Sequence, residues 1–330
     1  MGLIVRKPGL LTTVQDLGRT GYQRYGVVVC GAVDGFAARV ANLLVGNPDI
    51  ATVLEMAIIG PDLQFEEETL IAWCGGEFDP KLNAQSLPKD RPVRVPAGGV
   101  VSFGPAKSGA MAWLAVAGGL DVPVRLGSRS THRRAQFGGH EGRGLIPGDR
   151  IELLPPSERA SEWLATFASS GRTSPTWSVK PSALGKPIEA GVLRFVRGPE
   201  WDWFDRTVQR TFVTADYRVT KDADRMGLRL EGPPLSLAPP RELISSAVNT
   251  GVVQVPPSGL PIILSAARQT VGGYPRIAAL AAVDFPALAQ LKPGDQIRFR
   301  EIPLARAHEL YIGREQDLNR VRNGLVRLPG

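Results

Sequence analysis

Residues that build disulfide-linked or metal-bound domains are scarce in this chain. Its 330 residues include two cysteines, Cys30 and Cys74, and three histidines. Two cysteines are too few for a disulfide framework, so the composition favours a reducing compartment. The histidines are His132, His140 and His308, and the last of them lies in a charged tail. The sequence therefore predicts no metal-ligand set.

Long apolar runs are missing as well. No stretch approaches the ~20 consecutive apolar residues that cross a bilayer. The first ten residues carry Arg6, Lys7 and Pro8, where a signal peptide needs an apolar run. We therefore expect a soluble, cytoplasmic protein that does not associate with a membrane.

The charge pattern and the catalytic motifs exclude further classes. Basic residues exceed acidic ones, 39 against 32, for a formal net charge of +7. They are scattered and do not form a basic stripe with interleaved aromatics, so nucleic-acid binding is not expected. The P-loop, the H-E-x-x-H zinc motif and the G-x-S-x-G nucleophile elbow are all absent from the sequence. No catalytic residue can be assigned from motifs.

Glycine and proline are abundant, with 37 and 28 residues, which favours many short strands joined by turns. Short apolar or alternating runs predict strands at residues 2–5, 69–74, 99–103, 111–116, 150–154, 192–196, 251–255, 261–265 and 296–300. Helices are predicted at residues 35–44 and 158–168, and a short helical turn at 285–291. The predicted fold class is mainly β, as a barrel or a sandwich.

Two sequence phrases occur twice, in the same order. V-x-V-P-x-x-G is found at residues 93–99 and 253–259, and L-x-P-G-D-x-I at residues 145–151 and 291–297. Repetition of this kind indicates two related domains.

A stretch rich in Ser, Pro and Ala separates the two copies and is typical of a linker. We predict a first β-barrel domain at residues 1–160, a linker at 161–190 and a second β-barrel domain at 191–330.

A polar phrase that follows the first predicted strand contains Gln15, Asp16 and Arg19, and Asp34 closes the next Gly-rich segment. Carboxylates and an arginine on Gly-rich loops suit a site for a small polar substrate. A second interpretation remains open, in which Asp16 caps a turn and Arg19 pairs with it at the surface.

The longer loop of the first copy carries Arg129, Ser130 and Thr131, followed by a Gly-rich stretch. Hydroxyls, guanidinium groups and backbone N–H donors together can hold a phosphate or a carboxylate. A solvated basic loop would explain the same residues.

The corresponding region of the second copy contains Arg268, Gln269, Thr270 and Tyr274 around a Gly-Gly pair. Arg225 precedes a predicted strand and either reaches a ligand or pairs with a neighbouring aspartate. Recurrence of these polar clusters at one end of both predicted domains favours a shared cleft.

Five phrases together resemble the biotin-dependent carboxyltransferase family, also called allophanate hydrolase subunit 2 or KipA. They are G-L-L-T-T-V-Q-D-L-G-R-x-G-Y at 9–22, A-N-L-L-V-G-N-P at 41–48, G-S-R-S-T at 127–131, D-R-M-G at 224–227 and Q-T-x-G-G-Y-P at 269–275. The resemblance runs from about Leu3 to Phe299 and implies two cyclophilin-like β-barrel domains related by internal duplication. One departure is His132-Arg133-Arg134, where the family usually has an apolar or aromatic residue after Ser-Thr.

The resemblance also implies a component of an enzyme complex. Stand-alone members of the family include the C subunit of bacterial ATP-dependent 5-oxoprolinases, which acts with the A subunit and a KipI-like B subunit. The implied reaction converts 5-oxo-L-proline, ATP and water to L-glutamate, ADP and phosphate, with ATP bound in the assembled complex. Two alternatives remain. One is the carboxyltransferase component of a urea carboxylase or allophanate hydrolase system. The other is a KipA-like regulator that binds a KipI-like inhibitor of a histidine kinase.

Overall fold

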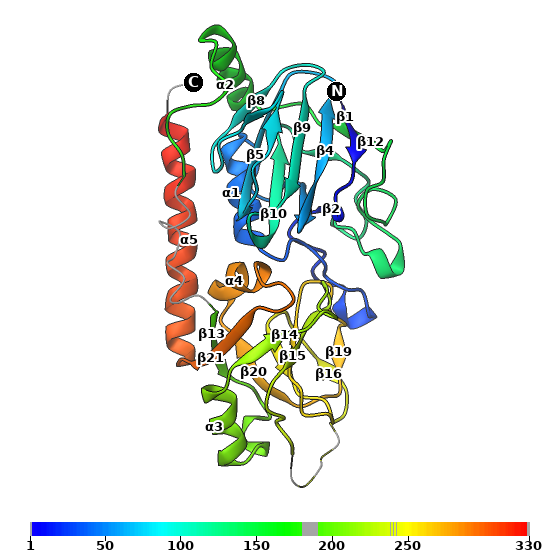
Figure 1. Cartoon of the computed structure of the whole chain (residues 1–330), viewed down its shortest axis with the longest axis vertical. Helices are drawn as coiled ribbons and strands as arrows, with labels where there is room; N and C mark the ends of the chain where they lie inside the picture. Colours follow the sequence, from blue (N-terminus) through cyan, green and yellow to red (C-terminus); the bar gives the residue numbers. More distant parts are fainter. Residues whose placement is uncertain (1, 180–190, 238, 240, 242, 329–330) are drawn as a thin grey trace. The chain divides into compact units, whose positions relative to one another are not determined.

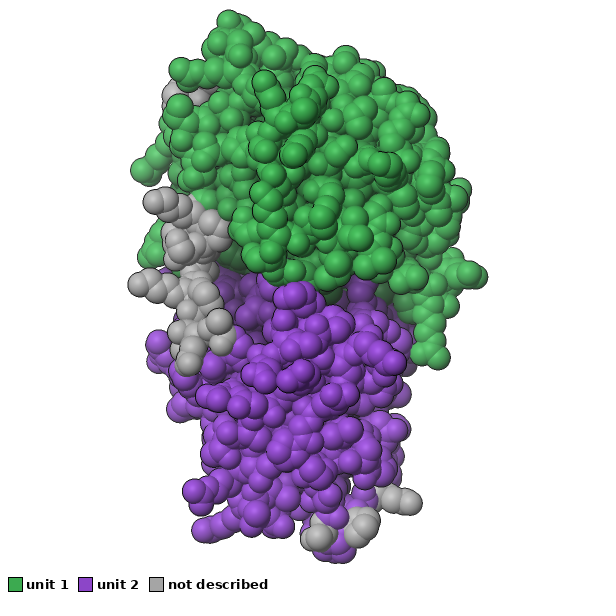
Figure 2. Space-filling model, in the orientation of Figure 1, with its two compact units in different colours: residues 1–19, 30–184, 317–330 green, residues 20–29, 185–316 purple. Residues whose placement is uncertain are grey.

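The computed structural model describes residues 2–179, 191–237, 239, 241 and 243–328, and Figure 1 traces its elements along the chain. Contacts divide the chain into two compact units, which are coloured separately in Figure 2. Unit 1 comprises residues 1–19, 30–184 and 317–330, and unit 2 comprises residues 20–29 and 185–316. Within the described residues, every helix is too short or too polar to cross a bilayer.

Unit 1 consists of two β-sheets with helices against them. The strands of the seven-stranded sheet, in spatial order, are β11 (Leu120–Asp121), β12 (Arg150–Leu153), β1 (Gly2–Lys7), β4 (Ile59–Phe65), β9 (Val100–Pro105), β6 (Lys81–Leu82) and β7 (Gln85–Ser86). Those of the five-stranded sheet are β2 (Leu11–Gln15), β3 (Val53–Ala57), β10 (Ser108–Val116), β5 (Thr69–Glu77) and β8 (Val93–Val95). Alternate side chains of these strands form one buried apolar core that includes Phe65, Trp73 and Phe103.

Three helical segments complete the described part of unit 1 before the C-terminal helix. They are α1 (Gly35–Leu44), η2 (Arg133–Ala135) and α2 (Glu158–Ser169). The apolar face of α1 buries Val40 and Leu44, and the face of α2 buries Trp163 and Phe167. The helices predicted at 35–44 and 158–168 are confirmed, because their apolar residues recur at the helical period.

Unit 2 is built on a closed barrel of seven strands. In spatial order they are β13 (Val192–Arg197), β20 (Arg276–Leu280), β17 (Val252–Gln254), β18 (Ile262–Leu264), β15 (Gly227–Glu231), β14 (Tyr217–Val219) and β21 (Gln296–Glu301). A separate pair joins β16 (Ser246–Ala247) to β19 (Val271–Gly272). The remaining elements are η1 (Gln23–Tyr25), η4 (Trp201–Trp203), α3 (Arg206–Thr214), η5 (Ala282–Asp284) and α4 (Phe285–Ala289). The mainly β fold class and all nine predicted strands are confirmed.

The repeated V-x-V-P-x-x-G phrase forms the same turn in both units. Its last glycine donates to the carbonyl of its proline, from Gly99 to Pro96 at 3.0 Å and from Gly259 to Pro256 at 2.9 Å. The carbonyl of each glycine also accepts a backbone N–H at 2.9 Å from a distant segment of its own unit. The strand that follows, β9 or β18, therefore starts from an equivalent turn.

The repeated P-G-D turn is also equivalent in the two units. Val5 on β1 and Val219 on β14 each bond through both N and O to the Gly-Asp pair of that turn, at 2.8 to 2.9 Å. The adjoining strands then follow the same antiparallel order, β12-β1-β4-β9 in unit 1 and β21-β14-β15-β18 in unit 2. The copies differ beside this block, because β21 also pairs in parallel with β13, whereas β12 pairs with β11.

The two compact units differ from the predicted domain boundaries in three places. Residues 20–29 group with unit 2, although they lie inside the predicted first domain. Part of the predicted linker folds onto unit 1 as α2, and beyond it the N–H groups of Arg94 and Val179 donate to the carbonyls of Thr173 and Asp90. Linker residues 180–190 lie outside the described residues.

The third difference is a C-terminal helix where the sequence indicates a charged tail. Helix α5 (Leu304–Arg327) has 24 residues, and its contacts group with unit 2 up to residue 316 and with unit 1 from residue 317. Ala307, Leu318 and Leu325 are buried along it, in a sequence that is otherwise rich in charge. Because few buried apolar residues are spaced along the helix and charged residues lie between them, the helical period is weak in the sequence, and the helix was not predicted.

Candidate functional site

The carboxylate of Asp16 is the centre of the polar cluster in unit 1. It accepts hydrogen bonds from Ser128 Oγ at 2.7 Å, Ser130 Oγ at 2.5 Å and the Arg129 N–H at 2.6 Å. It also accepts the N–H of Gly18 at 2.7 Å, which closes a tight turn. The structure therefore brings the two predicted polar phrases of unit 1 together, and Asp16 fixes the backbone of residues 128–130.

Arg19 is buried beneath this cluster, with 1% of its surface exposed. Its guanidinium lies over the ring of Phe137, 4.6 Å from the centroid, and donates to the carbonyls of Ser130 and Arg125. The interpretation that Arg19 pairs with Asp16 at the surface is wrong, because the side chain is buried and donates to backbone carbonyls. Its Nη1 has no hydrogen-bond partner within the described residues.

Gln15 and Thr131 complete the buried side of the cluster. Thr131 bonds through its N–H and its hydroxyl to the carbonyl of Val14, at 3.0 and 2.8 Å. The Gln15 amide donates to Thr13 Oγ1 at 3.0 Å and to the carbonyl of Thr131 at 3.4 Å. Its Oε1 is buried and finds no donor in the described part of the chain. The cluster thus holds an unused donor on Arg19 and an unused acceptor on Gln15.

Arg129 is the residue of this cluster whose guanidinium keeps terminal N–H donors available for a ligand. Its Nε donates to the carbonyl of Val122 at 2.9 Å, and its side chain is half-buried. Among the described residues, no partner is found for its two terminal nitrogens. A planar guanidinium with two terminal donors can bind a carboxylate or a phosphoryl group in a bidentate manner.

Asp34 caps a helix, whereas the sequence suggested it as part of a site for a small polar substrate. Its Oδ1 accepts the N–H groups of Phe36 at 3.0 Å and Ala37 at 2.9 Å, so it is the N-cap of α1. Next to it, the N–H of Val33 donates to the buried carboxylate of Glu55 at 2.9 Å. Asp34 therefore positions α1.

The unit 2 residues form a cluster of their own. Arg268, which is 6% exposed, donates to the carbonyl of Val248, to Thr250 Oγ1 and to Asn249 Oδ1, at 3.2, 2.9 and 3.4 Å. The carbonyl of Arg225 accepts the N–H of Ala267 at 2.8 Å, which places the D-R-M-G loop beside this segment. These contacts give Arg268 the role of holding the loop at 248–250.

Gln269, Thr270 and Tyr274 lie in the same cluster. Gln269 donates to Gln254 Oε1 at 3.4 Å, and Gln254 donates to the carbonyl of Tyr274 at 3.2 Å. The carbonyl of Thr270 accepts the N–H of Val248 at 3.1 Å. Tyr274 is 44% exposed and is the most accessible of the predicted residues here.

The two polar clusters do not occupy corresponding positions in the duplicated connectivity, contrary to the prediction. In unit 1, three strands, β9, β10 and β11, separate Arg129 to Thr131 from the repeated V-x-V-P-x-x-G phrase, whereas in unit 2 only β18 separates Arg268 from that phrase. The repeated phrases on either side are equivalent, but the segments between them have diverged. Sequence offsets alone could not show whether the two polar segments occupy equivalent or different places in the two copies.

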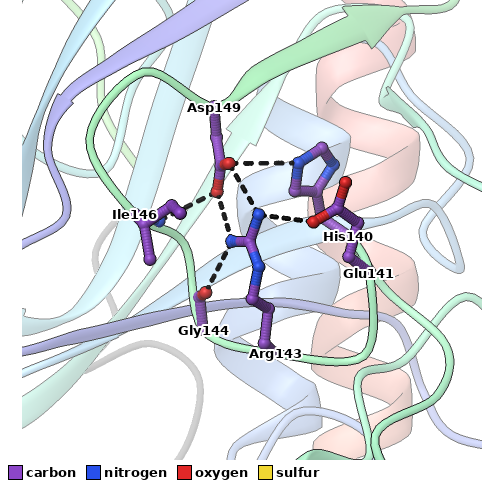
Figure 3. Close-up of polar contacts among 6 residues, drawn as sticks. All are labelled: His140, Glu141, Arg143, Gly144, Ile146 and Asp149. Atoms are coloured by element: carbon purple, nitrogen blue, oxygen red, sulfur yellow. Dashed lines mark hydrogen bonds and ion pairs between the residues drawn. The ribbon is translucent and has the colours of Figure 1, made fainter.

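A third group, drawn in Figure 3, joins the Gly-rich stretch at 138–143 to Asp149, and sequence reasoning missed this pairing. Asp149, from the P-G-D turn, pairs with Arg143 through two hydrogen bonds, and its Oδ1 lies 3.5 Å from Nε2 of His140. Arg143 also binds Glu141 at 2.5 Å and the carbonyl of Gly144 at 3.0 Å. The repeated P-G-D phrase was the available signal, because its aspartate recurs at a structurally equivalent turn.

Burial by itself would raise the pKa of Asp149, but hydrogen bonds from Arg143 and from the N–H of Ile146 outweigh that effect. Charge interactions with His140 and Arg143 act in the same direction, so the pKa of the carboxyl is held below its usual range. The ionised Asp149 anchors the loop that includes residues 138 and 139. The N–H of Gly139 in turn donates to the carbonyl of Arg129 at 3.0 Å. Through this bond, the group around Asp149 helps to hold Arg129 of the Asp16 cluster in place.

Comparisons with known proteins identify relatives of this chain. The family model for the carboxyltransferase domain, subdomains A and B, matches residues 25–301. The chain is 35% identical to the 5-oxoprolinase C subunit of Haemophilus influenzae over 94% of each chain. It is 36% identical to the 5-oxoprolinase C subunit of Escherichia coli K12, over 92% of this chain and 93% of that one.

A solved structure, the urea amidolyase of K. lactis, superposes with a TM-score of 0.85 and 29% identity. The match covers 97% of this chain and 20% of that longer one. This chain belongs to the carboxyltransferase-domain family, subdomains A and B, and its predicted resemblance is confirmed.

Proposed function

We propose that this chain is the C subunit of an ATP-dependent 5-oxoprolinase that acts together with the A and B subunits of that enzyme. The observation that carries the proposal is the 35–36% identity to two 5-oxoprolinase C subunits, across more than nine-tenths of their length. The urea amidolyase structure is less similar, at 29% identity.

The chemistry of the proposed reaction explains why a polar, cationic cluster is useful. A lactam is stabilised by resonance and resists water. Phosphorylation of its amide oxygen by ATP weakens that resonance and creates a leaving group, after which water releases L-glutamate and phosphate. Donors near the amide oxygen stabilise the charge that develops there. Arg129 has free terminal donors, so it is the first choice for that role, ahead of Arg225 and Arg268.

Two buried atoms of the cluster also have unused hydrogen-bonding capacity of the kinds that an amide complements. The C=O of a lactam accepts a hydrogen bond and its N–H donates one, on the same side of the ring. Arg19 has an unused donor and Gln15 an unused acceptor, both in the Asp16 cluster. Satisfying two buried polar groups at once would favour binding, because an unpaired buried group costs about 1–3 kcal/mol.

The test is glutamate release from 5-oxo-L-proline by this chain co-purified with its A and B partners, with and without ATP. Arg129→Ala should lower turnover or affinity ~10- to more than 100-fold, the effect of losing a charge-assisted hydrogen bond of ~1.5–3 kcal/mol. Gln269→Ala should also lower activity, whereas Arg133→Ala, an exposed arginine on the same loop, is the matched control. All three should bind the partner proteins normally. No ATP-dependent turnover with all three components present would refute the proposal.

The similarity to urea amidolyase favours one alternative, a carboxyltransferase component that works with a carboxybiotin carrier and a urea-type substrate. The same purified chain distinguishes the two. Transfer of labelled carboxylate from a carboxylated biotin carrier to urea, without any glutamate release from 5-oxo-L-proline, would favour the carboxyltransferase.

A further inference from the structure

Gln254 in unit 2 occupies the variable position of the repeated V-x-V-P-x-x-G phrase, where unit 1 has Arg94. Its neighbours Val253 and Val255 belong to the apolar core of the barrel. Because side chains alternate along a strand, Gln254 lies on the outer face of the barrel. It is nevertheless only 1% exposed. A polar side chain enclosed in this way is held by its hydrogen bonds.

The ribbon of β16 and β19, both labelled in Figure 1, covers this amide. A Cβ placed on Gly272 of β19 would lie 2.5 Å from Nε2 of Gln254. Arg276, opposite Gln254 on β20, donates to the carbonyl of Ala247 on β16 at 3.3 Å and pairs with Glu200 at 2.7 Å. The ribbon therefore lies against the barrel over Gln254, where the backbone passes too close for a residue larger than glycine.

The hydrogen bonds of Gln254 determine which way round its amide lies. Its Nε2 donates to the carbonyl of Tyr274 at 3.2 Å. A carbonyl oxygen can only accept, so the NH₂ end of Gln254 must face Tyr274 and its oxygen must lie at the other end. That oxygen accepts Nε2 of Gln269 at 3.4 Å. The orientation of the first amide thus sets the orientation of the second.

This series of bonds leaves the oxygen of Gln269 for a ligand. The NH₂ end of Gln269 faces Gln254, so its Oε1 lies at the opposite end of the amide. Among the described residues no donor is found for this Oε1, and it is not one of the fully enclosed polar atoms there. An amide oxygen has two lone pairs and no hydrogen, so it offers only an acceptor.

We propose that Gln254 is a positioning residue that fixes the amide of Gln269, and that Oε1 of Gln269 accepts an N–H group of an amide-type substrate. The inference rests on the proposed function for the substrate, because the ring nitrogen of 5-oxo-L-proline carries such an N–H. A reversed Gln269 amide would place its NH₂ against that N–H, and two donors repel. The bonded orientation therefore selects an N–H over an oxygen or an N-methyl group in the same place.

Three five-membered rings that share a carbonyl test the acceptor. 2-Pyrrolidinone has a ring N–H, N-methyl-2-pyrrolidinone carries a methyl group on that nitrogen, and γ-butyrolactone has an oxygen in its place. The dissociation constant of each is measured with the full-length chain by ligand-observed NMR. 2-Pyrrolidinone should bind about three- to tenfold more tightly than the other two, the effect of one hydrogen bond. Gln269→Met should abolish that preference, whereas Gln296→Met, at an exposed glutamine on β21, should keep it.

Two substitutions of Gln254 separate orientation from packing. Gln254→Met offers no acceptor to Gln269, so the Gln269 amide is free to rotate and the preference for the lactam should be lost. Gln254→Glu keeps an acceptor oxygen facing Gln269, so the preference should remain. A role in packing alone predicts the reverse order, because a carboxylate fits an enclosed position less well than a methionine. Thermal unfolding of both variants shows whether loss of preference follows loss of stability.

Three results would overturn the proposal. They are equal binding of the three rings to the parent, a Gln269→Met variant that still prefers the lactam, and a Gln254→Met variant with the parent's preference. Binding is measured without ATP and without partner proteins. A failure of the assembled enzyme to release glutamate is therefore a separate result, which counts against the proposed function and not against the orientation of Gln269.

Discussion

Arg143 and Asp149 are joined by two parallel hydrogen bonds, from Nη1 to Oδ2 at 2.7 Å and from Nη2 to Oδ1 at 2.8 Å. This bidentate pair links the loop beside the polar cluster to the P-G-D turn that starts β12. The counterpart of Asp149 in unit 2, Asp295, makes a local pair with Lys292 at 3.0 Å. The two copies therefore share a turn, but only the first uses it to hold a long loop.

This difference predicts unequal effects of one substitution at the two turns. The side chain of Asp149 is 8% exposed and that of Asp295 is 29% exposed. Asp149→Asn should lower the free energy of unfolding by ~1–3 kcal/mol, because it breaks a charge-assisted pair in a mostly buried setting. Asp295→Asn should cost less than ~1 kcal/mol. Denaturant unfolding of both variants measures this, and equal losses would contradict the proposed role of Asp149.

The effect of Asp149→Asn should also depend on pH. The pKa of Asp149 is lowered in the folded chain, so its contribution is fully present above the unfolded value of ~4 and is lost as the pH falls through the folded value. The stability difference between parent and variant should therefore shrink as the pH falls below about 4. A difference that stayed constant down to pH 3 would show that the ionised carboxylate is not involved.

The contribution of Asp90 to stability should change with pH in the opposite direction to that of Asp149. Burial raises its pKa to about 6, although the charges of Lys89 and Arg91 act against that, and it is hydrogen-bonded to Cys74. Between pH ~4 and 6 the folded chain then binds more protons than the unfolded chain, so the free energy of unfolding falls as the pH rises. Asp90→Asn should be more stable than the parent by ~1–3 kcal/mol at pH 8 and no more stable at pH 4.

The backbone at this position suits the test. Asp90 has φ of 57°, a conformation that Asn adopts more readily than most residues. Denaturant unfolding of the parent and of Asp90→Asn at pH 4, 6 and 8 provides the measurement. A stabilisation that did not change with pH would point to relief of backbone strain and not to titration of the carboxyl.

The Asp16 cluster predicts a local change in amide exchange. Asp16→Ala removes the acceptor of the Arg129 N–H and of both serine hydroxyls, so residues 127–131 should exchange faster by at least tenfold. Asp34→Asn is the control, because an asparagine can still cap α1 through the N–H groups of Phe36 and Ala37. Hydrogen exchange read by mass spectrometry on both variants gives the comparison. If residues 127–131 exchanged at the parent rate in Asp16→Ala, Asp16 would not be the residue that fixes this backbone.

Alanine substitutions at two glycines with the same backbone conformation should lower the free energy of unfolding by different amounts. Gly118 and Gly148 have φ of 86° and 90°. A Cβ at Gly118 would lie 1.9 Å from the carbonyl oxygen of Leu154, whereas one at Gly148 would meet nothing within 4 Å. Gly148→Ala should cost ~1 kcal/mol from the left-handed backbone alone. Gly118→Ala should cost ~2–4 kcal/mol because the steric conflict adds to it. Thermal unfolding of the two variants checks the ranking.

The sequence by itself predicted the regular elements well, because their signals are local. The strand from Thr69, the helix from Gly35 and the repeated P-G-D turn each depend on residue types within a few positions of one another. The family resemblance and the duplication follow from phrases of the same kind. Local steric and apolar patterns set these features, and they are readable without a fold.

Only the tertiary structure decided which polar residues meet. Asp16 and Ser130 are 114 positions apart, and their hydrogen bond depends on how β2 and the loop after β11 are brought together. The same is true of the capping role of Asp34, the burial of Arg19 and the assignment of residues 20–29 to unit 2. Helix α5 belongs to this group too, because most of its surface is polar and its sparse buried positions gain stability from contacts with distant segments. A side chain's role in such cases is set by its neighbours in space, which a single sequence does not specify.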